Sequence, residues 1–230
     1  MKKILVTGGE GRFASELKKV NTKFNFIFLS KKKLNILHSS SILKNINLFK
    51  PDAILHLAGL SRPMNVHDEN ISKSISLNII GTCNVVNACI RKKIKIIYFS
   101  TSYLYPGKKG NYKETDSLLP WNNYGWSKLG AESAVQMYKN SLIVRVCMTE
   151  RPFVHSRAYV NVKNSFIFQD EVAKIFLKVI NKKGIYNLGG KSQTIFNFAK
   201  KNNINVRKIF SKGEYPLNLS INLNKINKIL

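Results

Sequence analysis

The stretch KILVTGGEGRFA, residues 3–14, joins a short β-branched run to a glycine-rich turn and then to a segment with helical spacing. Residues 3–7 read as a buried strand, and between Gly11 and Val20 the apolar residues fall on one helical face. In a strand–turn–helix unit of this kind, glycines let the backbone approach the pyrophosphate of a dinucleotide. The stretch therefore predicts nucleotide binding, with cofactor contacts at Gly8, Gly11, Arg12 and Phe13.

Apolar runs and helical segments alternate along the rest of the chain. We expect further strands at residues 24–29, 53–57, 94–100, 142–146 and 184–188, and helices at 39–49, 71–91, 121–140, 170–181 and 193–200. Apolar strands separated by helices are typical of a parallel sheet covered on both faces. The predicted fold is α/β, a Rossmann-type doubly wound parallel sheet in a single domain of residues 1–230. Its core spans about 1–146, and a small substrate lobe spans about 147–230.

The net charge of +26 is almost all lysine, spread from end to end together with abundant Asn and Ile. This pattern indicates a compositional bias, and arginine, the usual reader of base edges, is sparse. We therefore expect no specific nucleic acid partner, but a positive field that attracts anionic substrates and cofactors. No apolar run approaches the ~20 residues that span a bilayer, and the apolar run at the N-terminus is too short for export. These features predict a cytoplasmic protein without a membrane span.

The three cysteines, Cys83, Cys89 and Cys147, are scattered through apolar segments. Their odd number and spacing suit neither a disulfide framework nor a metal site. We expect buried, reduced thiols and no bound metal.

The end of the second predicted strand bears on the choice of cofactor. A free ribose 2′-hydroxyl is usually held there by an acid, but this chain has Leu29-Ser30-Lys31-Lys32-Lys33. Ser30 and Lys31 suit a 2′-phosphate, to which Arg12 could add, so NADPH is favoured and NADH stays possible. These lysines could equally be one more sample of a lysine-rich composition.

The third predicted strand ends in His56-Leu57-Ala58-Gly59, whose small residues could let a dinucleotide lie against the backbone. We interpret His56 as structural and expect cofactor contacts at Leu57, Ala58 and Gly59. Asn78 either organises the backbone or a water near the site or is a plain polar helix residue.

Hydroxyl groups and a Tyr-x-x-x-Lys pair predict the chemistry. The fourth strand ends in Phe99-Ser100-Thr101-Ser102-Tyr103-Leu104-Tyr105, and Tyr124 and Lys128 lie one helical turn apart. An ammonium group near a phenol favours the phenolate, so we expect Lys128 to lower the pKa of Tyr124 toward neutral. A hydroxyl that holds a carbonyl oxygen beside Tyr124 would complete a proton-transfer site, with the hydride coming from the cofactor.

In order, these motifs resemble the extended short-chain dehydrogenase/reductase family. The resemblance rests on the glycine turn, His56 to Gly59, Asn78-Ile-Ile-Gly81-Thr82, Ser100-Thr101 and Tyr124-x-x-x-Lys128 followed by Glu132, and it covers about residues 3–146. Ser100 to Gly107 is most similar to a segment of the dTDP-4-dehydrorhamnose reductase branch, the sugar-nucleotide reductases. The region between Val146 and Phe166, which supplies the substrate lobe in the family, is much shorter here.

The resemblance implies roles for individual residues. Thr101 is then the catalytic hydroxyl and Tyr124 the proton donor, while Lys128 binds the nicotinamide ribose and tunes Tyr124. Ser100 would lie against the cofactor. The substrate-side candidates are Ser102, Tyr103, His155 as an acid, and Arg145, Arg151 and Arg157 as a diphosphate clamp; for the arginines, surface positions without a ligand are an equal alternative.

The sequence thus predicts an NAD(P)-dependent sugar-nucleotide oxidoreductase that reduces a keto group on a nucleotide-activated sugar, as in polysaccharide biosynthesis. Ser102-Tyr103 stands where the dehydratases of the family have an acid pair, so dehydration is not expected. Two alternatives stay open: a nucleotide-sugar 4-epimerase with retained NAD, and a non-catalytic dinucleotide sensor or polyanion-binding protein. The family resemblance also implies a homodimer.

Overall fold

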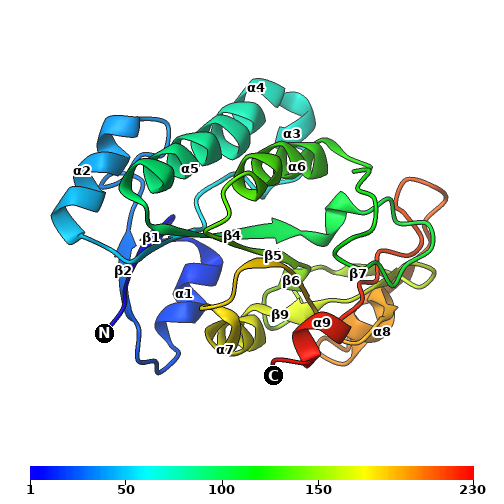
Figure 1. Cartoon of the computed structure of the whole chain (residues 1–230). Coiled ribbons are helices and arrows are strands. Elements are labelled where there is room, and N and C mark those ends of the chain that lie inside the picture. Colours follow the sequence, from blue (N-terminus) through cyan, green and yellow to red (C-terminus); the bar gives the residue numbers. More distant parts are fainter.

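A six-stranded sheet forms the centre of the molecule in the computed structural model, which describes residues 1–230 (Figure 1). Its order is β10-β5-β4-β3-β1-β2, and every neighbouring pair is parallel. The strands are β1 Lys3–Thr7, β2 Asn25–Leu29, β3 Ala53–His56, β4 Lys95–Thr101, β5 Ser141–Val146 and β10 Gly184–Leu188. Each predicted strand is present, with ends shifted by at most a residue.

Helices cover both faces of this sheet, which confirms the doubly wound α/β fold (Figure 1). One face is covered by α1 Arg12–Lys18 and α7 Gln169–Val179, and the other by α2 Ser39–Phe49, α5 Gly81–Lys92 and α6 Asn123–Gln136. On the first face, the Phe99 ring of β4 packs 4.7 Å from Phe13 of α1 and 5.2 Å from Phe176 of α7. The apolar faces that the helical spacing predicted are therefore the ones that are buried.

The long helix predicted at 71–91 is present as a continuous helical run over residues 71–92, with a π-helical turn inside it. The structure has α3 Val66–Glu69, α4 Ile71–Ser74, a π-helical turn η1 Ile75–Ile80, and then α5. Gly81 begins α5 directly after this turn, and a Cβ there would lie 2.6 Å from Cδ1 of Ile36, so a larger residue would require the Ile36 side chain to move. Such π-helical turns often occur at functional sites, and η1 contains Asn78.

The order in which the chain adds strands to the sheet reverses at β1. From β1 it first adds β2 on one side and then crosses to β3 on the other. Open α/β sheets bind ligands outside the carboxyl ends of the strands at such a switch point. The segments that follow β1, β3, β4 and β5 all emerge at this carboxyl edge.

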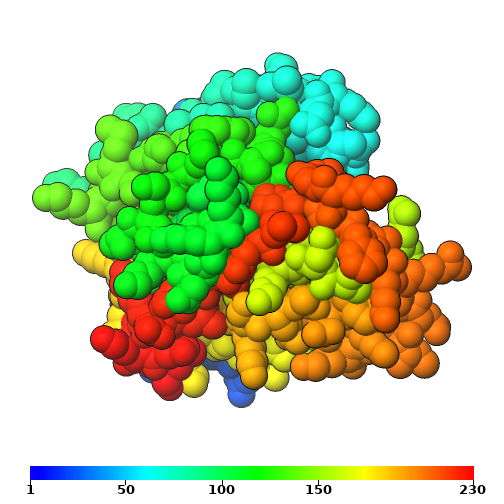
Figure 2. Space-filling model, turned by 90° about the vertical axis from the view of Figure 1, so that its right-hand side faces the viewer, coloured from blue at the N-terminus to red at the C-terminus, as the bar shows by residue number.

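The residues after β5 form a small lobe around a core of nine buried residues. Its elements are β6 Met148–Thr149, β7 Arg157–Tyr159, β8 Lys163–Asn164, β9 Ile167–Phe168, β11 Gln193–Thr194, α8 Ile195–Lys200, β12 Arg207–Ile209 and α9 Asn224–Asn227. In Figure 2 the C-terminal segment, in red, runs between the green residues that follow β4 and the orange part of the lobe.

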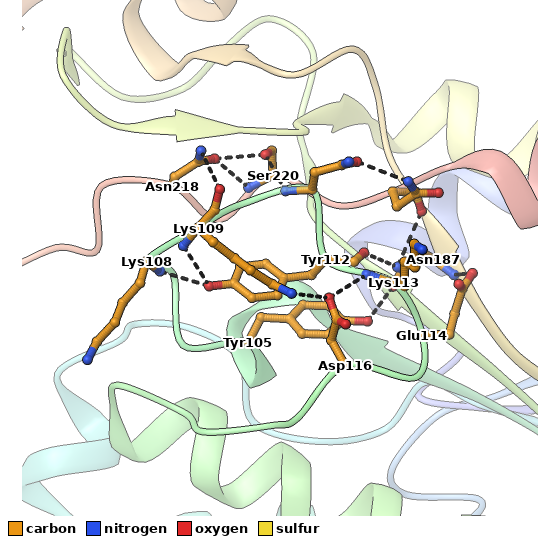
Figure 3. Close-up of polar contacts among 12 residues, drawn as sticks. Tyr105, Lys108, Lys109, Tyr112, Lys113, Glu114, Asp116, Asn187, Asn218 and Ser220 are labelled. Carbon is orange, nitrogen blue, oxygen red and sulfur yellow. Dashed lines mark hydrogen bonds and ion pairs between the residues drawn. The ribbon is translucent and has the colours of Figure 1, made fainter.

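The segment after β4, which begins with the 3-10 turn η2 Ser102–Leu104, is bonded to that C-terminal segment (Figure 3). The backbone of Tyr112 donates to the carbonyl of Ser220 at 3.1 Å, and its carbonyl accepts from the backbone of Asn222 at 2.8 Å. The rings of Tyr105 and Tyr112 stack 4.8 Å apart, and the Asn187 side chain of β10 joins both. These contacts hold the lobe against the edge of the sheet.

Candidate active site

The glycine turn packs directly on the end of β3. Gly8 has a φ of +67°, and a Cβ there would lie 2.8 Å from the backbone nitrogen of Ala58. The Thr7 hydroxyl accepts from the backbone of Leu57 at 3.2 Å and of Ala58 at 3.1 Å. His56 is buried between the hydroxyls of Thr7 and Thr82, at 2.8 and 3.0 Å. The interpretation of His56 as structural is confirmed, and the two predicted cofactor segments lie side by side.

We expect Gly8→Ala to destabilise the chain more than Gly213→Ala. Both glycines have positive φ, at +67° and +116°, but a Cβ at Gly213 would meet nothing within 4 Å. The backbone strain of alanine is thus common to both variants, and the clash with Ala58 is confined to Gly8. Thermal unfolding followed by circular dichroism compares them. Equal losses of Tm in the two variants would show that the turn yields to a side chain.

Asn78 joins the segment after β3 to α6. Its side chain accepts from the backbone of Leu60 at 2.7 Å and donates to the carbonyl of Leu60 at 2.9 Å. It also donates at 2.8 Å to the hydroxyl of Ser127, which in turn donates to the carbonyl of Tyr124. Of the alternatives open for Asn78, the structure supports a residue that organises the backbone around the site.

Thr101, Tyr124 and Lys128 come together at the carboxyl edge. Thr101 ends β4 and its hydroxyl accepts from the backbone of Tyr103 at 3.2 Å, and the Tyr103 ring packs 6.0 Å from the Tyr124 ring. Tyr124 lies in the first turn of α6, where the Asn122 side chain caps the helix by accepting from Gly125 at 2.7 Å. Lys128, one turn on, donates to the carbonyl of Phe99 at 2.8 Å and lies 4.1 Å above the Tyr98 ring.

Burial controls the protonation of this cluster. Desolvation raises the pKa of Tyr124 to about 12, although the Thr101 hydrogen bond and the guanidiniums of Arg62 and Arg12 act in the opposite direction. Desolvation also lowers the pKa of Lys128 to about 7. The expectation that Lys128 brings the pKa of Tyr124 toward neutral is not supported, because desolvation outweighs the nearby positive charges. At neutral pH the Tyr124 phenol keeps its proton, the state that a proton donor requires.

Several neighbours of Tyr124 were not found from the sequence. The buried His67 ring packs 5.1 Å from the Tyr124 ring, and Tyr103 packs 6.0 Å from it on another side. Tyr215, far along the chain, donates from its hydroxyl to that of Tyr103 at 2.6 Å, and its ring lies 4.6 Å from Trp121. No local pattern marks Tyr215, since the contact joins residues more than a hundred positions apart.

The predicted substrate contact at Ser102 is contradicted. Ser102 is fully buried, and its hydroxyl lies beside the thiol of Cys147, also buried. The reason is that Ser102 begins η2, which turns its side chain beneath the site. Ser100 is likewise buried, whereas Tyr103 is only partly buried and stays a candidate.

The predicted diphosphate clamp is also wrong at Arg145. Its side chain is 2% exposed and pairs with the buried Glu132 carboxylate at 2.7 Å. It further donates to the Tyr105 hydroxyl at 2.9 Å and to the carbonyl of Glu114 at 3.0 Å. Arg145 lies on β5, between two other strands of the sheet, so its guanidinium points into the protein and binds no ligand.

Arg151 and His155 lie at the surface of the lobe. The Arg151 guanidinium pairs with Asp170 at 3.3 Å and Glu171 at 2.8 Å, which ties it to the start of α7. Arg157 is exposed on β7. The exposed His155 packs on Phe153, and its pKa is lowered by desolvation and by the nearby Arg62 charge. The substrate roles of Arg151 and His155 stay predictions.

At the end of β2, Ser30 is half-buried and Lys31 is exposed, as a phosphate contact would need. Arg12 does not point there. Its guanidinium donates to Glu150 at 2.8 Å and to the Ser61 hydroxyl at 3.2 Å, on the side of β3 and β5. The expectation that Arg12 faces a ribose 2′-phosphate beside Ser30 is therefore not supported.

Comparison with known proteins places this arrangement in a family. Residues 1–154 match the model of the RmlD substrate binding domain. The chain belongs to the RmlD substrate binding domain family. The match covers the glycine turn, Thr101, Tyr124 and Lys128, and it confirms the predicted resemblance to the dTDP-4-dehydrorhamnose reductase branch.

Two curated relatives of this RmlD-family chain are named as a reductase and as a subunit of an adenosyltransferase. A dTDP-4-dehydrorhamnose reductase of Aggregatibacter actinomycetemcomitans is 30% identical over 154 residues, 65% of this chain and 52% of that protein. A methionine adenosyltransferase 2 subunit beta of Pongo abelii is 29% identical over 143 residues, 58% of this chain and 42% of that protein. The match thus spans about half the length, or less, of these relatives.

Among solved structures, dTDP-4-dehydrorhamnose reductase from Bacillus anthracis in complex with NADP superposes with a TM-score of 0.88. It is 22% identical, and the superposition covers 100% of this chain and 93% of that one. At this identity the likeness shows the fold, and it extends into the lobe.

The RmlD-family chain has free thiols at Cys83, Cys89 and Cys147, of which Cys89 and Cys147 are buried and Cys83 is partly buried. No group of His, Cys, Asp and Glu side chains is arranged to hold a metal ion. None of its helices has the length and apolar character required to cross a membrane.

Proposed function

We propose that this chain is an NADPH-dependent reductase of a keto group on a nucleotide-activated sugar. The observation that carries the proposal is the cluster of Thr101, a protonated Tyr124 and Lys128 at the carboxyl edge, beside the glycine turn. The name of the reductase relative, which shares the matched region, supports the same activity.

The residues present fit a dinucleotide. A side chain at Gly8 would collide with Ala58, so the turn and the end of β3 leave the close backbone surface that a pyrophosphate needs. Gly8, Gly11, Phe13, Leu57, Ala58 and Gly59 would supply this surface. Ser30 and Lys31 would favour a 2′-phosphate, and no acid follows β2 to hold a free ribose. NADP in the solved reductase supports this preference, and NADH stays an alternative.

The chain's own residues would then position and protonate the substrate. The bound cofactor supplies a hydride to the carbonyl carbon. Tyr124 donates its proton to the carbonyl oxygen, and Thr101 orients that oxygen through its hydroxyl. Lys128 would hold the nicotinamide ribose. Because Lys128 already donates to the carbonyl of Phe99 and the Tyr124 ring packs against His67 and Tyr103, both side chains are positioned before a ligand arrives.

A screen of NADPH oxidation against a panel of nucleotide-linked ketosugars tests this function. We expect the absorbance at 340 nm to fall with at least one ketosugar and to stay constant with the corresponding 4-hydroxy sugars. Absence of oxidation across the panel, with NADPH binding intact, would sink the reductase proposal.

Two other functions have support. A 4-epimerase would use the same residues with retained NAD, and it would copurify with cofactor and consume no NADPH. A non-catalytic role is the other alternative, and one relative of this chain is named a subunit of methionine adenosyltransferase. That role would show as dinucleotide binding without turnover of any sugar, and polyanion binding would show as steeply salt-dependent RNA or DNA binding.

We also propose a cytoplasmic homodimer. Exposed apolar side chains at Ile71, Ile75 and Ile80 lie on α4 and η1, and Trp126 and Met137 lie on or directly after α6. These two helical segments are neighbours on the same face of the sheet (Figure 1). A second copy would cover apolar surface that is otherwise exposed to water.

A further inference from the structure

One carboxylate at the carboxyl edge holds two arginines. Glu150 accepts from Arg12 at 2.8 Å, and it accepts from the same Nη1 of Arg62 with both oxygens at 2.9 Å. The Glu150 side chain is 20% exposed, against 46% for Arg12 and 33% for Arg62. All three groups can therefore be reached from solvent.

The three residues come from three different segments. Arg12 follows the glycine turn after β1, Arg62 lies in the segment after β3, and Glu150 follows β6. Those segments surround the surface where the glycine turn meets Ala58. The charges of Arg62 and Arg12 also lower the pKa of the Tyr124 phenol. Through Glu150 and Ser61, the arginine pair connects the start of α1, after the glycine turn, to the segment after β3.

The cluster has an excess of positive charge and hydrogen-bond donors that have no partner. Two guanidiniums share one carboxylate, which leaves a net charge of +1. Arg62 uses only Nη1 in hydrogen bonds, so its Nε and Nη2 groups have no partner within the chain. By contrast, Arg145 is buried with Glu132, and Arg151 is tied to two acids of α7. Unlike Arg145 and Arg151, Arg12 and Arg62 therefore keep capacity for an anion.

We propose that Arg12 and Arg62 bind the diphosphate of the ligand, and that Glu150 is an internal counter-ion which this diphosphate displaces. The proposal rests on the proposed function for the identity of the ligand, which is a dinucleotide or a nucleotide sugar. A planar guanidinium donates two parallel hydrogen bonds to phosphate oxygens, and a diphosphate carries more negative charge than a single carboxylate. Glu150 keeps the two arginines folded toward the site, at a modest cost in ligand affinity.

Two variants with opposite expected signs test the proposal. Arg62→Gln should weaken binding of a diphosphate ligand roughly tenfold to a hundredfold, because it removes charge-assisted hydrogen bonds. Glu150→Gln keeps the shape of the side chain but removes its charge, and should tighten binding roughly threefold or more. Arg91→Gln removes the same charge from an exposed position at the end of α5 and should change neither.

Binding is measured without turnover, by fluorescence titration of NADPH and of NADH and by calorimetry with dTDP in saturating NADPH. Equal losses for NADPH and NADH in Arg62→Gln would support a dinucleotide diphosphate. A loss confined to dTDP would support the diphosphate of a nucleotide sugar. Because no sugar is reduced in these titrations, failure of the reductase screen would leave their outcome unaffected.

Other results would overturn the proposal. A loss for NADPH but not NADH would assign Arg62 to the 2′-phosphate, and unchanged binding of all three ligands would remove Arg62 from the site. Weaker binding by Glu150→Gln would show that Glu150 positions the arginines for the ligand instead of competing with it. Arg62→Lys, which keeps the charge, should recover part of the affinity and guards against a folding defect in Arg62→Gln.

Discussion

Replacing Tyr124 with phenylalanine is expected to lower kcat for ketosugar reduction by roughly 10²- to 10⁴-fold, the range that general acids contribute. The variant loses only the hydroxyl, and the ring keeps its packing against His67 and Tyr103. Because the glycine turn packs on Ala58 and does not depend on this phenol, NADPH affinity should stay nearly unchanged. Steady-state kinetics with the active ketosugar and fluorescence titration of NADPH measure the two quantities.

Tyr138→Phe is the matched control for this loss of a phenol. Tyr138 lies just after α6 and donates to the carbonyl of Ile94 at 3.1 Å, outside the cluster around Tyr124. Its removal should leave kcat at the wild-type value. If Tyr124→Phe turned over as fast as Tyr138→Phe, Tyr124 would not be the proton donor.

The largest effect on stability is expected from Arg145→Met, which we predict to lower the free energy of unfolding by about 3–5 kcal/mol. The substitution leaves the Glu132 carboxylate, 0% exposed, without its ion-pair partner. The Tyr105 hydroxyl and the Glu114 carbonyl also lose the hydrogen bonds that Arg145 donates to them. Both groups belong to the network that holds the C-terminal segment (Figure 3). For a chain of this size the loss corresponds to a fall in Tm on the order of 10 °C.

A second substitution separates charge from packing. Adding Glu132→Gln to Arg145→Met removes the unpaired charge, so the double variant should regain part of the lost stability. Lys19→Met is the control, because it breaks an exposed ion pair with Glu16 and should cost less than about 1 kcal/mol. An Arg145→Met variant as stable as Lys19→Met would contradict the structural role given to this pair.

Local sequence patterns were sufficient for the six central strands and the main helices that cover them, but not for the short strands of the lobe. The helix predicted at 39–49 is α2 with the same bounds, and the strand at 184–188 is β10. The long helix before β4 was predicted as one piece because helical spacing persists through a π-helical turn, which adds a single residue per turn. Gly81, directly after the π-helical turn, packs against Ile36, a contact between segments far apart in the sequence.

The candidate site was only partly predictable, because some of its contacts also join segments that are far apart in the sequence. Thr101, Tyr124 and Lys128 end up together because each follows from a local motif on an element whose place the sheet fixes. The partners of the arginines could not be predicted from local motifs. Nothing near Arg145 in the sequence shows that Glu132 will meet it inside the protein, and nothing near Arg62 points to Glu150, 88 residues away.

The glycine-rich turn and the alternation of strands and helices determined the α/β fold from sequence alone, and the Tyr124–Lys128 spacing led to the proposed chemistry, because each depends on neighbours within a few residues. The tertiary structure decided which charges are buried. It placed Arg145 in a closed ion pair, left Arg12 and Arg62 open around Glu150, and kept Tyr124 protonated through burial. Burial and charge pairing depend on residues that only folding brings into contact, so composition and spacing cannot supply them.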